Sequence, residues 1–354
     1  MGQLLVTGGA GFIGWNFIRL ALDLDPTVAI TNLDALTYAG NPLNFDELSE
    51  SAGKRHTFVH QDIRDVSGIK NVFESCEFDA VVHFAAESHV DRSILGPGAF
   101  IETNITGTFN LLEAALNYWA KNGKPANFRF LHISTDEVYG SLGPKGYFAE
   151  TTPYDPSSPY SASKAASDHL VKAYHRTYGL PTLITNCSNN YGPYQFPEKL
   201  IPLMILNIVE EKPLPVYGDG KNVRDWLFVL DHCEAVLAVL QKGRPGETYN
   251  IGGNSEFQNI DIVNLLCDLL DAKLNRKSSS RRLITYVKDR PGHDRRYAID
   301  AAKIQRELGW RPKYEFEQAI EETVDWYHNH MDWVNSVRSG EYLKWIARQY
   351  GGNQ

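Results

Sequence analysis

Residues 7–14 read Thr-Gly-Gly-Ala-Gly-Phe-Ile-Gly and directly follow a short apolar run, Gln3–Thr7. Gly9, Gly11 and Gly14 match the spacing G-x-G-x-x-G, and Gly8, Gly11 and Gly14 match the wider spacing G-x-x-G-x-x-G. Such glycines allow a tight turn, close approach of the backbone to a pyrophosphate and close packing of a helix on a strand. The stretch therefore predicts a dinucleotide-binding turn in which a helix N-terminus faces the negative charge.

Further along the chain, apolar or β-branched runs alternate with longer amphipathic stretches, which is typical of a parallel sheet wrapped by helices. We expect strands at Gln3–Thr7, Val28–Leu33, His56–His60, Asp79–Phe84, Phe128–Ser134 and Thr182–Cys187. Apolar residues at helical spacing predict long helices at Pro97–Ala120 and Tyr160–Tyr178. The predicted fold class is α/β, a Rossmann-type doubly wound parallel sheet.

The alternation loosens after Asn190, where Gly and Pro separate shorter segments. We expect residues 1–190 to form the dinucleotide-binding domain and to carry the catalytic residues, with some later segments returning to it. Residues 191–354 are expected to form mainly a smaller α+β domain for substrate, with terminal helices at its end. No internal repeat or low-complexity linker interrupts this plan.

Composition excludes several other classes of protein. The 354 residues carry a formal net charge of −8, which argues against binding to nucleic acid phosphates. No apolar run approaches the roughly 20 residues that cross a bilayer, so no membrane association is expected. Four cysteines lie far apart, without metal-ligand or redox spacing, and no secretory leader precedes the first predicted strand. We therefore expect a cytoplasmic protein.

Asp34 lies 20 residues after Gly14, at the end of the second predicted strand. An acid at this place can accept hydrogen bonds from the adenine ribose hydroxyl groups, whereas a 2′-phosphate would meet a like charge. The position therefore favours NAD over NADP, although an acid here could also cap a turn. Asp62 follows the third predicted strand and could serve the adenine edge. Ala85 and Ala86 end the fourth predicted strand and would let the chain pass close to the cofactor.

Tyr160 and Lys164 are four residues apart in a predicted helix, so their side chains share one face. A lysine ammonium group beside a phenol stabilises the phenolate and lowers the pKa of the tyrosine, which can then accept a hydroxyl proton from a substrate. Such a pair also arises by chance on helix surfaces. Its position favours function, because it follows the fifth predicted strand, where Thr135 offers a hydroxyl group to the same substrate oxygen.

The order of these motifs resembles the extended short-chain dehydrogenases that modify nucleotide sugars, over nearly the whole chain. Within that group the sequence is most similar to the dTDP-glucose 4,6-dehydratases. Five stretches carry the likeness: Thr135–Glu137, Phe84–Asp91, Asn189–Pro202, Pro215–Asp225 and Asp289–Asp294. The resemblance implies tightly bound NAD that is regenerated in each turnover, and a deoxysugar product of the kind that leads to rhamnose.

Asp136 and Glu137 distinguish dehydration from related reactions. A 4-epimerase needs a tyrosine base and a hydroxyl group, whereas loss of water needs one group for the C5 proton and another for the departing C6 hydroxyl. The resemblance implies that Asp136 is the acid and Glu137 the base. Two alternatives stay open: an NAD-dependent nucleotide-sugar 4-epimerase or decarboxylase, and a non-catalytic NAD-sensing protein.

The resemblance also implies sets of site residues. The expected catalytic residues are Thr135, Asp136, Glu137, Tyr160 and Lys164. The expected cofactor-binding residues are Gly8, Gly11, Phe12, Ile13, Gly14, Asp34, Ala35, Leu36, Thr37, Asp62, Ile63, Phe84, Ala85, Ala86, Thr103, Tyr160, Lys164 and Asn190. The expected substrate-binding residues are Ser88, Thr135, Asn189, Lys199, Leu200, Pro215, Tyr217, Arg224, Asn259, Arg290 and His293.

Three further expectations concern assembly, metal and one departure from the family. Members of the resembled group usually form homodimers through two long helices, here Pro97–Ala120 and Tyr160–Tyr178. His328 and His330 have the spacing of a metal pair, but no third ligand lies nearby, so no metal is expected. Trp15 follows the last motif glycine, where relatives usually carry serine, and we expect its indole ring to point off the helix toward protein or solvent.

Overall fold

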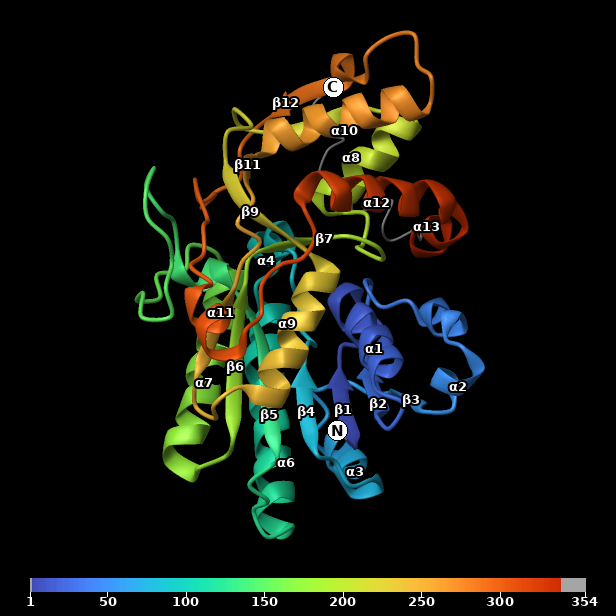
Figure 1. Ribbon diagram of the computed structural model, residues 1–354. Helices are drawn as coiled ribbons and strands as arrows, with labels where there is room; N and C mark the ends of the chain where they lie inside the picture. Colours follow the sequence, from blue (N-terminus) through green and yellow to red (C-terminus); the bar gives the residue numbers. More distant parts are fainter. Residues whose placement is uncertain (1, 339–354) are drawn as a thin grey trace.

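The computed structural model describes residues 2–338, and a sheet of parallel strands lies at its centre (Figure 1). From one edge to the other, the sheet contains β10 (Thr248–Ile251), β6 (Thr182–Cys187), β5 (Arg129–Thr135), β4 (Ala80–His83), β1 (Gln3–Thr7), β2 (Ala29–Asp34) and β3 (His56–His60). The six strands expected from the sequence are present within a residue or two. The predicted Rossmann-type class is confirmed.

Helices cover both faces of the sheet because the side chains of each strand alternate between two apolar clusters. On β1, Leu4 and Val6 belong to one cluster with α1 (Phe12–Leu24) and α9 (Val229–Lys242). Leu5 belongs to the other cluster, with α3 (Val66–Ser75), α6 (Thr108–Lys121) and α7 (Pro159–Tyr178). β1 and β4 are buried on both faces, which explains their nearly continuous apolar sequence, whereas the edge strand β3 is partly exposed.

Short elements connect these layers. They are η1 (Pro42–Glu47), α2 (Glu50–Gly53), α4 (Val90–Leu95), α5 (Gly98–Phe100) and η3 (Asp136–Tyr139). Trp15, on α1, is fully buried against Phe45, His56 and Tyr194, so its indole ring points into protein. α1 begins at Phe12, within the glycine stretch, as expected.

The later part of the chain forms a second body of structure, at the top in Figure 1. Its strands are β7 (Asn189–Tyr191), β9 (Val223–Phe228) and β11 (Glu256–Gln258) in one small sheet, and β8 (Leu214–Tyr217) and β12 (Ile284–Val287) in another. Its helices are α8 (Leu200–Val209), α10 (Asn259–Lys273), η4 (Ser280–Leu283), α12 (Phe316–Asn329) and α13 (Met331–Val337). The remainder of the expected terminal helical segment, residues 339–354, lies outside the described residues.

Three later elements return to the central sheet. β10 pairs with β6 in parallel register, with Thr248 opposite Ile184. α9 packs on α1 and on β6, and α11 (Ala302–Leu308) packs on β10. The central sheet is therefore completed by residues well beyond position 190.

The expected helix over residues 97–120 is interrupted. Between α5 and α6, residues Ile101–Gly107 form a π-helical segment, η2. Tertiary contacts hold it in place, because the Asn104 side chain bonds the backbone of Glu87 in both directions and donates to Ser163 on α7. Helical structure covers the expected residues, but its π-helical turns were not predicted, because apolar spacing carries no information about such polar anchoring.

Candidate active site

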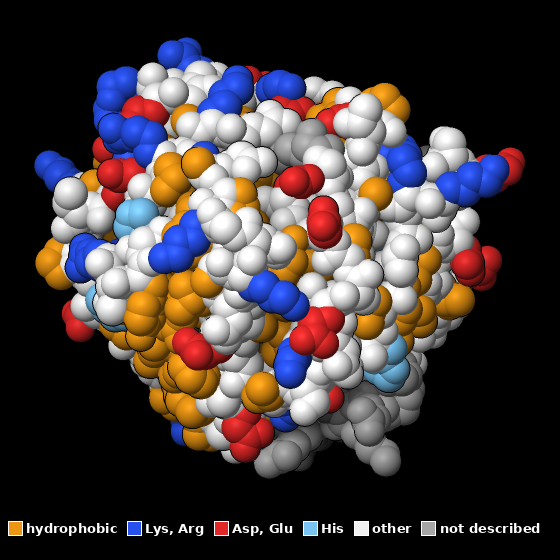
Figure 2. Space-filling model, turned by 90° about the horizontal axis from the view of Figure 1, so that it is seen from below, with side chains coloured by type: hydrophobic (Ala, Val, Ile, Leu, Met, Phe, Trp, Pro, Cys, Tyr) orange, Lys and Arg blue, Asp and Glu red, His pale blue; other side chains and the backbone are white. Residues whose placement is uncertain are grey.

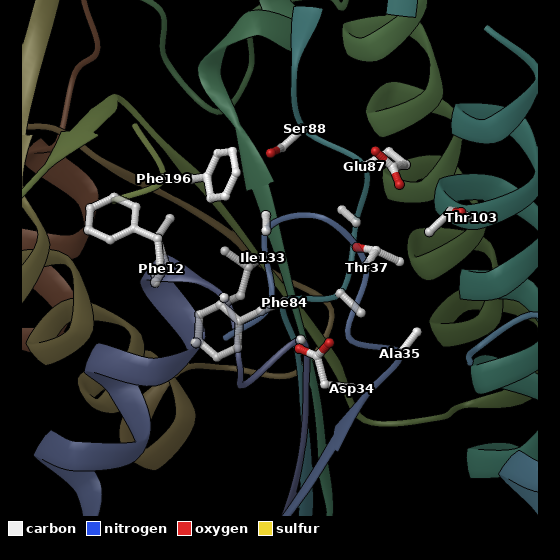
Figure 3. A pocket seen from close by; sticks show the side chains of 18 of the residues that line it. Phe12, Asp34, Ala35, Thr37, Phe84, Glu87, Ser88, Thr103, Ile133 and Phe196 are labelled. Carbon is white, nitrogen blue, oxygen red and sulfur yellow. The ribbon is translucent and has the colours of Figure 1, made fainter. Parts of the chain in front are cut away.

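The strand order changes direction at β1, whose neighbours are β2 on one side and β4 on the other. In open α/β sheets the crevice beyond the carboxyl ends of the strands at such a point is where ligands bind. The structure has a pocket at this place, lined by the glycine turn after β1 and by the ends of β2, β4 and β5. Figure 3 shows Asp34, Phe84, Ile133 and Ser88 arranged around this space.

The glycine turn is shaped by contacts that exclude any side chain. Gly8 has φ +74°, and a Cβ atom there would lie 2.6 Å from the backbone N of Ala85. A Cβ atom on Gly14 would lie 2.3 Å from Gly8 O. The turn therefore packs directly on the chain that leaves β4, and the first turn of α1 opens into the pocket.

Asp34 ends β2 and organises the same turn. Its Oδ2 atom accepts a hydrogen bond from Ala10 N at 2.9 Å, and Oδ1 accepts one from Leu36 N at 2.8 Å. Burial raises the pKa of this carboxyl group, while the two backbone N–H groups oppose the rise. Asp34 thus joins the glycine turn to the loop after β2, and it also faces the pocket.

Almost all residues expected to bind cofactor line this single pocket. They are Gly8, Gly11, Phe12, Ile13, Gly14, Asp34, Ala35, Thr37, Asp62, Ile63, Phe84, Ala85, Ala86, Thr103, Tyr160, Lys164 and Asn190. Leu36 does not line it, because its backbone turns at φ +49° and contributes only the N–H group to Asp34.

Helix α7 brings Tyr160 and Lys164 to the inner end of the pocket. The helix starts sharply because Ser158 and Ser161 form a reciprocal capping box with Pro159 at the first position. Lys164 Nζ donates a hydrogen bond to Ile133 O at 2.8 Å. The expected fall in the pKa of Tyr160 is contradicted: burial, Glu137 and Cys187 raise that pKa well above its usual value, and the Thr135 hydroxyl group opposes them.

Thr135, at the end of β5, directs the two carboxyl groups that follow it. Its Oγ1 atom accepts a hydrogen bond from Glu137 N at 3.3 Å and caps the 3-10 turn of η3. The turn sends the neighbouring side chains in different directions: Glu137 lines the pocket, whereas Asp136 lies behind its wall and is 1% exposed.

The surroundings of the two carboxyl groups differ in charge. Burial, Glu137 and Asp225 raise the pKa of Asp136 well above its usual value, so Asp136 holds a proton into a higher pH range. Burial also raises the pKa of Glu137, but three cationic residues oppose the rise: Arg290, Arg224 and Lys199. Asp136 thus suits a proton donor, and Glu137 lies where cations favour its ionised form.

A group of charged and aromatic side chains lies beyond Glu137. Arg290 lies 3.4 Å from Asp91 Oδ1 and 3.4 Å from His293 Nε2, with its guanidinium group 5.2 Å from the centre of the Tyr217 ring. The hydroxyl group of Tyr217 lies 3.3 Å from Asp91 Oδ2. Burial, Arg290 and Arg224 lower the pKa of His293 to about 4, so its ring is neutral near neutral pH.

The expected substrate residues divide into two sets. Ser88, Thr135, Asn189 and Lys199 line the same pocket as the expected cofactor residues, whereas Leu200, Pro215, Tyr217, Arg224, Asn259, Arg290 and His293 do not line it. Arg224 is 6% exposed and donates to Val223 O and Asp294 O. Leu200, Pro215 and Asn259 lie on α8, β8 and α10.

The sequence reasoning missed several residues of the pocket wall. Tyr38, Glu198 and Phe196 line the pocket, and Arg92 joins them: its guanidinium group lies 3.8 Å from the centre of the Tyr38 ring and donates to Glu198 Oε2 at 3.0 and 3.1 Å. Tyr38 could have been found, because it lies in the loop that follows Asp34. Arg92 and Glu198 have no such signal, since they are 106 positions apart.

Three features define an extended short-chain dehydrogenase: a Rossmann-type sheet, a Tyr-x-x-x-Lys pair on a helix beside the pocket, and a hydroxyl group at the end of β5. The family profile described as GDP-mannose 4,6 dehydratase matches residues 5–323. The chain belongs to this family of sugar-nucleotide dehydratases, within it to the dTDP-glucose 4,6-dehydratases.

The relatives that show this are similar over their full lengths. A dTDP-glucose 4,6-dehydratase of Salmonella typhimurium is 57% identical, over 99% of this chain and 100% of the relative. A crystal structure of the dTDP-glucose 4,6-dehydratase of Streptomyces venezuelae with NAD bound has 47% identity and a TM-score of 0.85, covering 95% of this chain and 99% of that one. The UDP-glucose 4-epimerase of Thermus thermophilus, solved with NAD, has 29% identity and a TM-score of 0.82, covering 93% and 99%.

Proposed function

We propose that the chain converts dTDP-glucose into dTDP-4-keto-6-deoxyglucose and water, as an NAD-dependent hydro-lyase. The observation that carries this proposal is the run Thr135–Glu137. It places one carboxyl group in the pocket beside Tyr160 and a second, buried one, whose pKa burial raises, directly behind the wall. The identity to relatives of that name supports the same reaction.

The residues of the pocket fit NAD. The glycine turn has no room for a side chain at Gly8 or at Gly14, and it opens the first turn of α1 toward the pocket, where a pyrophosphate would lie. Asp34 presents a carboxylate at the end of β2, where ribose hydroxyl groups would lie and a 2′-phosphate would be repelled. Bound there, NAD supplies the hydride acceptor for C4 and the hydride donor for C6.

In the oxidation step, Tyr160 takes the proton of the C4 hydroxyl group, and Thr135 donates a hydrogen bond to the same oxygen. Lys164 contributes its charge beneath the reacting centre, where its buried ammonium group is fixed by Ile133 O. Because burial raises the pKa of Tyr160, positive charge near the phenol is needed for it to act as a base.

In the elimination step, the C4 ketone acidifies the proton on C5, and Glu137 removes it. Asp136 gives a proton to the C6 hydroxyl group as it leaves, which explains why a carboxyl group with a raised pKa stands next to one that faces cations. Protonation of C5 by Glu137 forms the product, and exchange with solvent then removes the proton that Tyr160 took and returns one to Asp136.

The nucleoside diphosphate binds on the side of the later domain, residues 191–354. Arg224, Arg290 and Lys199 supply positive charge for the phosphate oxygens, and Tyr217 and His293 lie against Arg290. Leu200, Pro215 and Asn259 line the nucleoside end. Residues 1–190 hold NAD and the catalytic residues, together with the returning elements β10 and α9.

One experiment tests the function and the assignment of roles. The purified chain is incubated with dTDP-, UDP-, GDP- and CDP-hexoses in deuterated water, and products are analysed by mass spectrometry. Loss of water from dTDP-glucose with deuterium at C5 is expected, without added NAD. We expect Glu137→Gln to abolish deuterium at C5 and Asp136→Asn to slow release of water. An epimer with unchanged mass would overturn the proposal in favour of a 4-epimerase.

We also propose that the protein works in the cytoplasm as a homodimer. Cys187, Cys233 and Cys267 are buried free thiols, which suits a reducing compartment.

Large apolar side chains are exposed on α4, η2 and α6, namely Leu95, Ile101 and Phe109. Figure 2 shows hydrophobic side chains gathered toward the lower left of the face seen from below. Light scattering tests this: Phe109→Lys is expected to yield monomers. Within the described residues, no helix is long and apolar enough to span a bilayer.

A further inference from the structure

Helix α7 carries a third ionisable side chain on the face that bears Tyr160 and Lys164. Asp168 follows Lys164 by four residues, and both side chains are buried. Asp168 does not line the pocket and has no part in the reaction described above. A carboxylate in such a place is costly unless its charge and its oxygens are matched. The side chains that contact Asp168 therefore indicate its role.

Four polar side chains surround the Asp168 carboxylate. Oδ2 accepts hydrogen bonds from Ser134 Oγ at 2.9 Å, Tyr154 Oη at 2.8 Å and Asn186 Nδ2 at 3.3 Å. Oδ1 lies 3.3 Å from His132 Nε2. Burial would raise the pKa of Asp168, but His132, Lys164 and Ser134 hold it below its usual value, so the group is ionised.

The His132 ring lies between this carboxylate and the ammonium group of Lys164. The same Nε2 atom that faces Asp168 lies 3.4 Å from Lys164 Nζ. Lys164, His132 and Asp168 thus form a continuous row from the pocket into the core. Burial lowers the pKa of Lys164 to about 8, and the charge of Asp168 is the foremost influence that opposes this fall.

The other ionisable groups around this row do not replace Asp168. They are His83 on β4, Cys187 on β6, Tyr139 on η3, Tyr154 before α7, and Tyr160 and Lys172 on α7. Burial keeps His83 and His132 neutral by lowering their pKa values, that of His132 to about 4. Burial raises the pKa of the Cys187 thiol to about 12, so it carries no charge near neutral pH. η2 faces α7 with the uncharged Asn104.

We propose that Asp168 is a positioning residue that acts through Lys164: it supplies the buried counter-charge that keeps Lys164 cationic while Tyr160 takes the substrate proton. The inference rests on the proposed function, because that function gives Lys164 its role. A lysine in so dry a place would otherwise release its proton close to neutral pH. The row therefore extends the working range of the enzyme toward alkaline pH.

Asp168→Asn tests this, since it keeps the size of the side chain and removes its charge. We expect the alkaline limb of the pH profile of kcat to move to lower pH by about one unit or more, with little change in KM for dTDP-glucose. The matched control is Tyr154→Phe, which removes one hydrogen bond to the same carboxylate and keeps its charge. Its alkaline limb should stay in place. Asp168→Glu should restore part of the wild-type profile.

A second measurement does not depend on turnover. The NAD retained by each purified variant is quantified after denaturation, following dialysis at neutral and at alkaline pH. Asp168→Asn should lose NAD at the alkaline pH selectively, and Tyr154→Phe should not. Equal shifts in both variants would overturn the proposal, because packing would then explain them. If Asp168→Asn fails to fold, Asp168→Ser carries the same test, because it also removes the charge. A wild-type chain that retains NAD but does not dehydrate dTDP-glucose would contradict the proposed function alone.

Discussion

The carboxylate of Asp91, on α4, lies 3.4 Å from the guanidinium group of Arg290, although 199 positions separate them. This contact joins the part of the chain that holds the pocket to the part that carries the candidate diphosphate ligands. The second oxygen of Asp91 lies 3.3 Å from the hydroxyl group of Tyr217, so one carboxylate orients two side chains of the later domain.

Asp91→Asn should therefore weaken substrate binding more than catalysis. We expect KM for dTDP-glucose to rise about tenfold, which corresponds to about 1.4 kcal/mol, with kcat little changed because Asp91 touches no reacting atom. Steady-state kinetics measure both values. Asp219→Asn is the control, because Asp219 forms an exposed ion pair with Arg295, and such pairs contribute little. A fall in kcat at constant KM would contradict the assignment.

Tyr160→Phe should lower kcat by roughly 10²–10⁴-fold, since it removes the general base and preserves the ring. Tyr178→Phe, at the far end of the same helix and 50% exposed, should leave the rate unchanged. Both variants are compared under saturating dTDP-glucose. A rate for Tyr160→Phe close to that of wild type would assign the base to another residue.

Gly8→Ala should destabilise the chain by about 1–3 kcal/mol, because it forces a side chain into a left-handed backbone. It should also reduce the NAD retained on purification, since the new Cβ atom would press against Ala85 N from 2.6 Å. Gly53→Ala is the control, as nothing lies within 4 Å of its Cβ position. Thermal unfolding and cofactor content measure the two effects, and equal melting temperatures for both variants would refute the steric reasoning.

His232 should contribute to unfolding in acid. Burial lowers its pKa from 6.5 to about 3, so the unfolded chain binds more protons than the folded one between these values. The free energy of unfolding therefore falls as pH drops through this window, by up to about 1.4 kcal/mol per pH unit from this group. His232→Gln should flatten the decline, and the exposed His328→Gln should not. Denaturant titrations at several pH values compare the slopes.

Six of the seven strands of the central sheet could be predicted because they are defined by local sequence, whereas β10 was missed. Runs such as Thr182–Cys187 are buried on both faces and end at turn residues, so both ends are visible without a structure. The glycine turn is equally local, since Gly8 and Gly14 satisfy steric demands within a few residues of one another. The class of cofactor follows from the same short segment together with Asp34.

Features that depend on distant contacts could not be predicted. The π-helical segment of Ile101–Gly107 is held by Asn104 against Glu87, which no periodicity shows. The different directions of Asp136 and Glu137 depend on the Thr135 cap, and the opposing influences on their pKa values come from Arg224 and Arg290, far along the chain. The raised pKa of Tyr160 was missed for the same reason, because it is caused by burial, Glu137 and Cys187.

The return of β10 to the edge beside β6 has a consequence for synthesis and for engineering. Until Ile251 has left the ribosome, β6 has an unpaired edge that could bind another chain. The nucleotide-binding half therefore cannot mature ahead of the half that follows it. Chimeras that exchange specificity between relatives should transplant separate surface loops, because a single cut near residue 190 would leave one strand of the sheet on the wrong side of the junction.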